Sequence, residues 1–101
     1  IKIYLMSSSL PSITVLFYSK IKQLIGQRKM DLNSDSIEDL LQKLFSLFGR
    51  CLFDELMLDE GVIKPQWRII INGRNINLLH GLSTKLKDGD LVAIVPAIAG
   101  G

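Results

Sequence analysis

The sequence has almost none of the residues that bind metals or form covalent cross-links. Its 101 residues include one cysteine, Cys51, and one histidine, His80. These two side chains cannot form an internal disulfide, complete a four-ligand zinc site or hold an iron–sulfur cluster. We therefore predict no bound metal and no resident cofactor. A lone cysteine also fits a reducing compartment such as the cytoplasm.

Long apolar runs and a one-sided charge are also missing. The longest uncharged apolar stretch, residues 91–101, is far shorter than the roughly 20 residues of a membrane-spanning helix, and it contains Pro96. Twelve basic residues against ten acidic ones give a net charge of +2, and the basic residues are scattered apart from a small group at 20–29. The sequence therefore predicts neither a membrane span nor a nucleic-acid-binding surface.

The remaining composition is that of one small globular domain. Hydrophobic residues make up 48% of the chain and charged residues 22%, which allows a real but small core. Residues 1–12 lack the charged start, the longer apolar core and the cleavage site of a signal peptide. We expect an N-terminal extension at 1–12 with little bearing on function, a folded domain at 13–95 and a flexible C-terminal tail at 96–101.

The first half of the domain is predicted to form two strands and a long helix. The β-branched and aromatic run at 13–18 suits a buried central strand, a short helical stretch follows, and the alternation at 28–33 predicts an edge strand. Ser36 then offers an N-cap oxygen with Asp39 three positions on, and apolar residues recur at helical spacing as far as Gly49. We predict the main helix here, with one face buried.

The second half is predicted to complete a mixed sheet. Residues 50–66 are irregular apart from a helical turn. A β-rich run at 67–71 leads into Asn72–Gly73, a dipeptide typical of a type I′ hairpin turn, and 75–78 can return as a short partner strand. The apolar run at 91–95 predicts a last strand in the middle of the sheet. One main helix packed on such a sheet is the α+β arrangement of the β-grasp fold.

Candidate catalytic groups are scarce. No pattern brings Cys51 and His80 together, so we interpret His80 as an ordinary surface or partly buried histidine. The acidic residues within 54–60 suit a solvated loop better than a metal or acid–base site. No glycine-rich phosphate loop exists, because all but the last two of the eight glycines fall at helix ends or turns.

The last two glycines end the chain, where no following element requires them. At a glycine frequency near 7%, two terminal glycines arise by chance in roughly one of two hundred chains. They close an uncharged segment of mostly small residues, 96–101, which would reach roughly 20 Å when extended and could pass through a narrow channel. Glycine leaves the terminal carbonyl open to an attacking group, so we predict that the reactive group is the carboxylate of Gly101.

The sequence also resembles a known family. The opening ITVLFYSKIKQLIG, the helix SIEDLLQKL, the hairpin IIING and above all the ending DGDLVAIVPAIAGG are similar to MoaD-type sulfur carriers, over residues 13–101. The resemblance implies a ubiquitin-like β-grasp fold and a carrier subunit rather than an enzyme. One departure is that the family commonly has two adjacent prolines and aromatic residues before its tail, where this chain has Val95, Pro96 and Ala97.

The resemblance further implies a reaction at the chain end. An E1-like adenylyltransferase of the MoeB type would use ATP to adenylate Gly101, which would then become a thiocarboxylate. The tail would thread into a MoaE-like large subunit of molybdopterin synthase, in a heterotetramer, through Pro96, Ile98, Ala99 and Gly100. There the sulfur would pass to precursor Z, cyclic pyranopterin monophosphate, in molybdenum cofactor biosynthesis.

A partner-binding surface is implied as well. The apolar partner-facing positions of the family fall at Tyr18, Ile76, Val95 and Ile98. For Tyr18 and Val95, a place in the core is an equally good interpretation. Similar proteins use the same activated glycine as protein modifiers, in tRNA thiolation or in thiamine thiazole synthesis. A β-grasp binding module that makes no use of its chain end is a third alternative.

Overall fold

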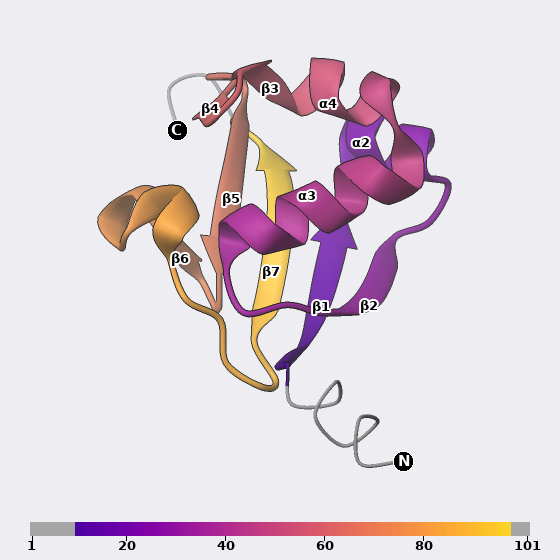
Figure 1. Ribbon diagram of the computed structural model, residues 1–101. Helices are drawn as coiled ribbons and strands as arrows, with labels where there is room; N and C mark the ends of the chain where they lie inside the picture. Colours follow the sequence, from indigo (N-terminus) through magenta and orange to yellow (C-terminus); the bar gives the residue numbers. More distant parts are fainter. Residues whose placement is uncertain (1–9, 98–101) are drawn as a thin grey trace.

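The structure is a computed structural model that describes residues 10–97. Within this range, a five-stranded mixed sheet and a separate two-stranded sheet are accompanied by three α-helices (Figure 1). The elements are, in order, β1 (Ser12–Phe17), α2 (Ser19–Ile25), β2 (Lys29–Asn33), α3 (Ile37–Phe48), α4 (Arg50–Leu56), β3 (Met57–Asp59), β4 (Val62–Ile63), β5 (Trp67–Ile71), β6 (Arg74–Asn75), the short 3₁₀ helices η1 (Ile76–Leu78) and η2 (Gly81–Ser83), and β7 (Leu91–Pro96). None of the described helices has the length and apolar character needed to cross a membrane.

The main sheet is organised around its last strand. Its order is β2-β1-β7-β5-β6, so β7 lies in the centre. β1 and β7 run parallel, in register from Thr14 opposite Leu91 to Phe17 opposite Ile94. The other neighbouring pairs are antiparallel. With α3 crossing one face, as Figure 1 shows, this is the predicted β-grasp fold.

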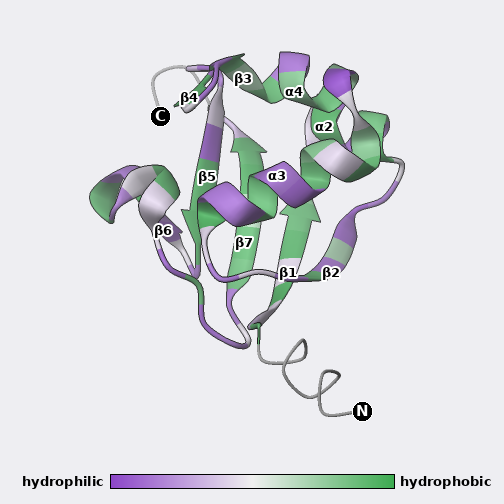
Figure 2. Ribbon diagram, viewed as in Figure 1, coloured by the Kyte–Doolittle hydropathy of each residue, from purple (hydrophilic) through white to green (hydrophobic). Residues whose placement is uncertain are grey.

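The core lies between the sheet and α3. Alternate residues of the central strands point to the helix side and are 0–2% exposed, among them Val15, Phe17, Val92 and Ile94. Figure 2 shows hydrophobic residues along these strands and hydrophilic ones on the outward side of α3. The residues between them face the other side of the sheet and are mostly half-buried. The predicted central strands are therefore confirmed, but only one of their faces is fully buried, because no described helix covers the other.

α3 begins at the predicted cap. Ser36 Oγ accepts a hydrogen bond from the Asp39 N–H at 3.1 Å. The Asp39 carboxylate does not complete a reciprocal box, because it accepts from Ser34 Oγ at 2.8 Å and lies 3.0 Å from Lys43 Nζ. The helix ends at Gly49, whose φ of 81° favours glycine over any residue with a side chain. A cap and a glycine thus fix the two ends of the main helix.

The segment 50–66 holds more regular structure than the sequence predicts. It forms α4 and then the small β3–β4 sheet. α4 buries Leu52 and Leu56 completely, and Trp67 Nε1 donates to Glu55 O at 3.0 Å, which ties the helix to the start of β5. A helix this short shows only one i, i+4 apolar pair, so periodicity gives a weak signal.

The hairpin turn is confirmed, but its return strand is shorter than predicted. Asn72 and Gly73 both have positive φ, 49° and 87°, as a type I′ turn requires. β6 ends at Asn75, whose Oδ1 accepts a hydrogen bond from the Asn77 N–H at 2.9 Å and starts η1. The turn carries Ile76 into the core, where it is 2% exposed. The longer strand is a wrong prediction, because a local side-chain bond diverts the backbone.

The buried face of α3 yields a test of the packing. Leu44 is 0% exposed, whereas Leu47 on the same helix is 59% exposed. We expect Leu44→Ala to lower the free energy of unfolding by about 2–5 kcal/mol, because it leaves a cavity in the core. Leu47→Ala is the matched control and should change it by less than about 0.5 kcal/mol. Equilibrium urea denaturation measures both, and equal losses would contradict the described packing.

The Asp39 carboxylate makes the stability of the fold depend on pH. The hydrogen bond from Ser34, together with the nearby Lys43 ammonium, lowers the pKa of Asp39. A carboxyl group whose pKa is lowered by folding stabilises the folded state above its unfolded pKa, and this stabilisation is lost as the pH falls through the folded pKa. We therefore expect Asp39→Asn to be less stable than the native sequence at neutral pH and to approach it below about pH 4.

Urea midpoints of the two proteins across this pH range measure the difference. Ser34→Ala removes the hydrogen-bond donor to Asp39. When Asp39→Asn is made in the Ser34→Ala protein, its effect on stability should depend less on pH than in the native sequence. A difference that stays constant with pH would contradict the role given to Asp39.

Candidate functional site

The predicted tail starts at the end of the central strand. β7 ends at Pro96, and the Ala97 N–H donates to Gln66 O at 2.7 Å, just before β5. The start of the tail is therefore attached to the start of β5 and lies at the sheet end where the parallel β1 also finishes. The remaining predicted tail residues lie outside the described residues: Ile98, Ala99, Gly100 and Gly101.

Pro96 occupies a position of β7 that needs no hydrogen-bond donor. Ladder bonds in an antiparallel pair alternate, and Gln66 with Ala97 is one of the bonded pairs. Pro96 lies opposite Trp67 at the adjacent position, where no bond to β5 is made. On the other side, β1 has already ended at Phe17. The missing N–H of proline thus breaks no ladder bond, and the residue is exposed at the last position of the strand.

Tyr18 and Val95 lie next to each other beside the start of the tail. The parallel register ends at Phe17 opposite Ile94, so the two following residues are neighbours on the sheet face away from the core. Tyr18 is 44% exposed, and Val95 is half-buried. Of the two interpretations open from the sequence, a place in the core is therefore wrong for Tyr18, and Val95 keeps one accessible side.

Ile76 does not lie on the sheet face that carries Tyr18 and Val95. Its side chain is 2% exposed and belongs to the core cluster, because η1 turns it inward. The structure contradicts the predicted contact between Ile76 and a partner.

Sequence reasoning missed the rest of the apolar face around the tail. Leu16, Ile70 and Ala93 project from the central strands on the same side as Val95 and are half-buried, and Leu91 is 42% exposed. Strand parity would have found them, because they alternate with the buried positions of each strand. The name open sheet face is used below for Leu16, Tyr18, Ile70, Leu91, Ala93 and Val95.

One cation lies on the open sheet face. Arg68 lies opposite Val95, and its Nη1 donates to two backbone carbonyl oxygens at 2.7 and 3.0 Å, which holds the guanidinium near the start of the tail. Lys20, in the first turn of α2, is instead paired at 3.5 Å with Glu55 Oε1 on α4. Arg68 therefore gives the face beside the start of the tail a positive charge.

No metal-binding cluster accompanies the tail within residues 10–97. In this range, no three His, Cys, Asp or Glu side chains lie close enough together to hold a metal ion. Cys51 is exposed on α4, and His80 is exposed immediately before η2. Three of the four acidic side chains of 54–60 have local partners, as in the 3.0 Å bond from Arg50 Nε to Asp54.

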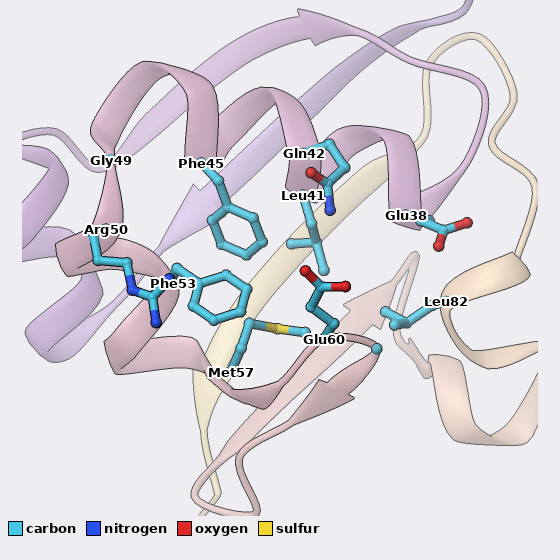
Figure 3. A pocket seen from close by; sticks show the side chains of 11 residues that line it. Glu38, Leu41, Gln42, Phe45, Gly49, Arg50, Phe53, Met57, Glu60 and Leu82 are labelled. Carbon is cyan, nitrogen blue, oxygen red and sulfur yellow. The ribbon is translucent and has the colours of Figure 1, made fainter.

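Two grooves are also present on the described surface. The helix groove, about 510 Å³, lies between α3, α4 and the β3–β4 hairpin, and Figure 3 shows its aromatic and charged side chains. Its lining includes Glu38, Phe45, Arg50, Phe53 and Glu60. The edge groove, about 480 Å³, lies along β5 between β4 and η1. Its lining includes Val62, Ile63, Lys64, Trp67, Arg68 and Ile69.

Comparison with known proteins points to one family. The ThiS family model matches residues 15–101. An Archaeoglobus fulgidus protein with the provisional name of sulfur carrier protein is 33% identical over 76 residues, which are 75% of this chain and 85% of that protein. Small archaeal modifier protein 3 of Haloferax volcanii is 30% identical over 92 residues, which are 84% of this chain and 94% of that protein.

A solved structure shares the fold over most of its length. The solution structure of small archaeal modifier protein 1 from Methanosarcina acetivorans matches with a TM-score of 0.76 at 27% identity, covering 91% of this chain and 98% of that chain. The chain therefore belongs to the ThiS family, within the ThiS/MoaD group of ubiquitin-like sulfur carriers.

Proposed function

We propose that this protein is the small subunit of molybdopterin synthase and carries sulfur as a thiocarboxylate on Gly101. The observation that carries the proposal is the placement of the tail, which starts where the central strand ends, in a chain whose family match extends to Gly101. A protein built in this way offers its end to other enzymes. It acts as a cosubstrate, and the catalytic groups belong to its partners.

The reaction begins with activation of the Gly101 carboxylate. A carboxylate is a poor acyl donor, so an E1-like enzyme of the MoeB type joins it to the α-phosphorus of ATP, forming an acyl-adenylate and releasing pyrophosphate. A hydrosulfide equivalent then attacks the acyl carbon and AMP leaves, so that one sulfur replaces one oxygen. A MoaE-like large subunit passes this sulfur to precursor Z, and water restores the carboxylate.

The composition of the tail suits insertion into a partner. Residues 96–101 carry no charged side chain. When the segment enters a partner, the terminal carboxylate is therefore the only charged group whose burial costs free energy. When extended, the segment spans about 20 Å, enough to reach a buried site from the surface of the carrier. Gly100 and Gly101 add no Cβ beside the reacting carbonyl, so nucleophile and nucleotide can approach it closely.

The open sheet face is the proposed contact with these partners. It extends from Tyr18, beside the start of the tail, to Leu91 at the other end of β7, and these two residues are 44% and 42% exposed. Apolar patches of this kind mark protein interfaces, and tyrosine is enriched among the residues that contribute most to binding. The neighbouring Arg68 favours a partner with acidic residues around its binding site.

A ubiquitin-like protein modifier is the second candidate. Small archaeal modifier protein 3, which is 30% identical, is named for such a role. A target lysine amine would then attack the activated glycine and form an isopeptide bond. Sulfur transfer to tRNA or to the thiamine thiazole would use the same thiocarboxylate with a different acceptor.

Intact mass spectrometry tests the carrier function. Incubation of the 101-residue protein with a cognate E1-like enzyme, ATP and a sulfur source is expected to add the mass of one sulfur-for-oxygen exchange. Addition of the large synthase subunit and precursor Z should then restore the original mass and yield molybdopterin. The chain without Gly100 and Gly101 is the matched control and should show no change, because it lacks the acceptor glycine.

Three outcomes would count against the carrier function. An unchanged mass with an enzyme of proven activity would count against the carrier. Recovery of Gly101 linked to lysines of other proteins in cell extracts would favour the modifier. Full activity of the shortened chain in a complementation assay would contradict both and favour a binding module that does not use its end.

Paired substitutions test the open sheet face. We expect Tyr18→Ala with Val95→Ala to raise the Kd for the activating enzyme about tenfold or more, because truncating an apolar anchor at an interface typically costs over 1 kcal/mol. Leu47→Ala with Leu78→Ala, at positions 59% and 79% exposed on other elements, is the matched control. Isothermal titration calorimetry measures both pairs, and equal effects would show that this face is not the contact.

A further inference from the structure

The edge groove lies close to the start of the tail. Its lining includes Lys64, Pro65 and Trp67, which surround Gln66 in sequence. Gln66 O accepts the 2.7 Å hydrogen bond from the Ala97 N–H, so the last described residue is fixed beside this end of the groove. The groove and the tail therefore meet at the start of β5.

The edge of β5 is open along this groove. β6 pairs only with Ile70 and Ile71, so the first half of β5 has no strand on its outer side within residues 10–97. Along β5, every second residue forms hydrogen bonds with β7, and the Asn72 and Ala97 N–H groups show that the bonded residues are the even-numbered ones. The peptide N–H and C=O of Ile69 therefore point away from β7 and toward the groove. An extended segment would find backbone partners there as well as apolar walls.

The tail is long enough to enter the groove at its near end. Crossing from β7 to the outer side of β5 takes two strand spacings, about 10 Å. Residues 98–101, fully extended, span about 13 Å. The terminal carboxylate can therefore reach Lys64 at the mouth of the groove, with little length to spare.

The charges of the edge groove favour a carboxylate. Lys64 and Arg68 are the only charged side chains in its described lining. The ion pairs found within residues 10–97 use other cations, in Lys20–Glu55, Lys43–Asp39 and Arg50–Asp54. The helix groove is less favourable, because two carboxylates, Glu38 and Glu60, line it (Figure 3) and its one cation, Arg50, is already paired with Asp54.

We propose that the tail, when no partner holds it, folds back across the start of β5 and places the Gly101 carboxylate against Lys64 in the edge groove. The inference rests on the carrier function proposed above for its role, which is to hold the reactive end on its own domain until a partner displaces it. A thiocarboxylate is also an anion, so Lys64 holds the loaded and the unloaded carrier alike. The apparent affinity of a partner is then its intrinsic affinity multiplied by the fraction of carriers whose tail is free.

Zero-length coupling with a carbodiimide tests the contact in the full 101-residue protein. The reagent joins a carboxylate directly to an amine that touches it, and peptide mapping is expected to find Gly101 joined to Lys64. Asp39 and Lys43, 3.0 Å apart, provide an internal positive control. Lys64→Arg keeps the positive charge but removes the amine, so the Gly101 product should disappear while the Asp39–Lys43 product remains.

Two coupling results would overturn the proposal. One is a Gly101 product at another amine, such as that of Lys20, in place of Lys64. The other is no Gly101 product in a sample where the Asp39–Lys43 product forms.

A second measurement avoids the reagent. Deletion of 98–101 is expected to shift the NMR amide signals of Ile63, Lys64 and Ile69 and to leave those of Phe45 and Phe53, in the helix groove, in place. Unchanged signals in the edge groove would also overturn the proposal. Sulfur loading by mass is a separate readout: a protein that gains sulfur without this contact refutes only the docking, and one that shows the contact but never gains sulfur refutes only the carrier function.

Discussion

The parallel pairing of β1 with β7 is the constraint on which the rest of the structure depends. It joins the first and last strands of the domain, and parallel neighbours cannot be linked by a tight turn. The chain between them must therefore cross one face of the sheet, and α3 makes that crossing with Ile37, Leu40 and Leu44 buried beneath it. β2 and β5 then add on the outer sides. β7 continues two residues beyond this pairing, alongside β5, and ends at Pro96, where the tail begins.

Elements with a strong local signal could be predicted from the sequence. The Ser36 cap defines the start of the main helix, and the Asn72–Gly73 dipeptide identifies the hairpin turn through its positive φ values. The return strand is predicted at 75–78, but its early end at Asn75 could not be predicted, because the bond from the Asn77 N–H to Asn75 competes with the strand ladder. α4 and the β3–β4 sheet are too short for periodicity to reveal. Their formation depends on distant contacts such as that between the Trp67 indole and α4.

Part of the candidate site could also be predicted from the sequence. Composition alone singles out the two terminal glycines, which lie outside the described residues. The family resemblance singles out Tyr18 and Val95, which follow the last paired residues of β1 and β7. The burial of Ile76 could not be predicted, because it follows from the η1 turn and not from any apolar period. The wider open sheet face is visible only once strand parity is known. It faces away from α3 because one helix of this length covers a single face of the sheet.

The central place of β7 also determines how the domain bears mechanical load. A partner that draws the tail into its active site pulls on β7 along its own axis. Because β1 flanks it in parallel and β5 in antiparallel orientation, such a pull shears two ladders together and does not unzip one bond at a time. A force applied to the end of the chain is therefore resisted by both ladders of β7. In the function proposed above, this resistance would keep the domain folded while a partner draws on the tail.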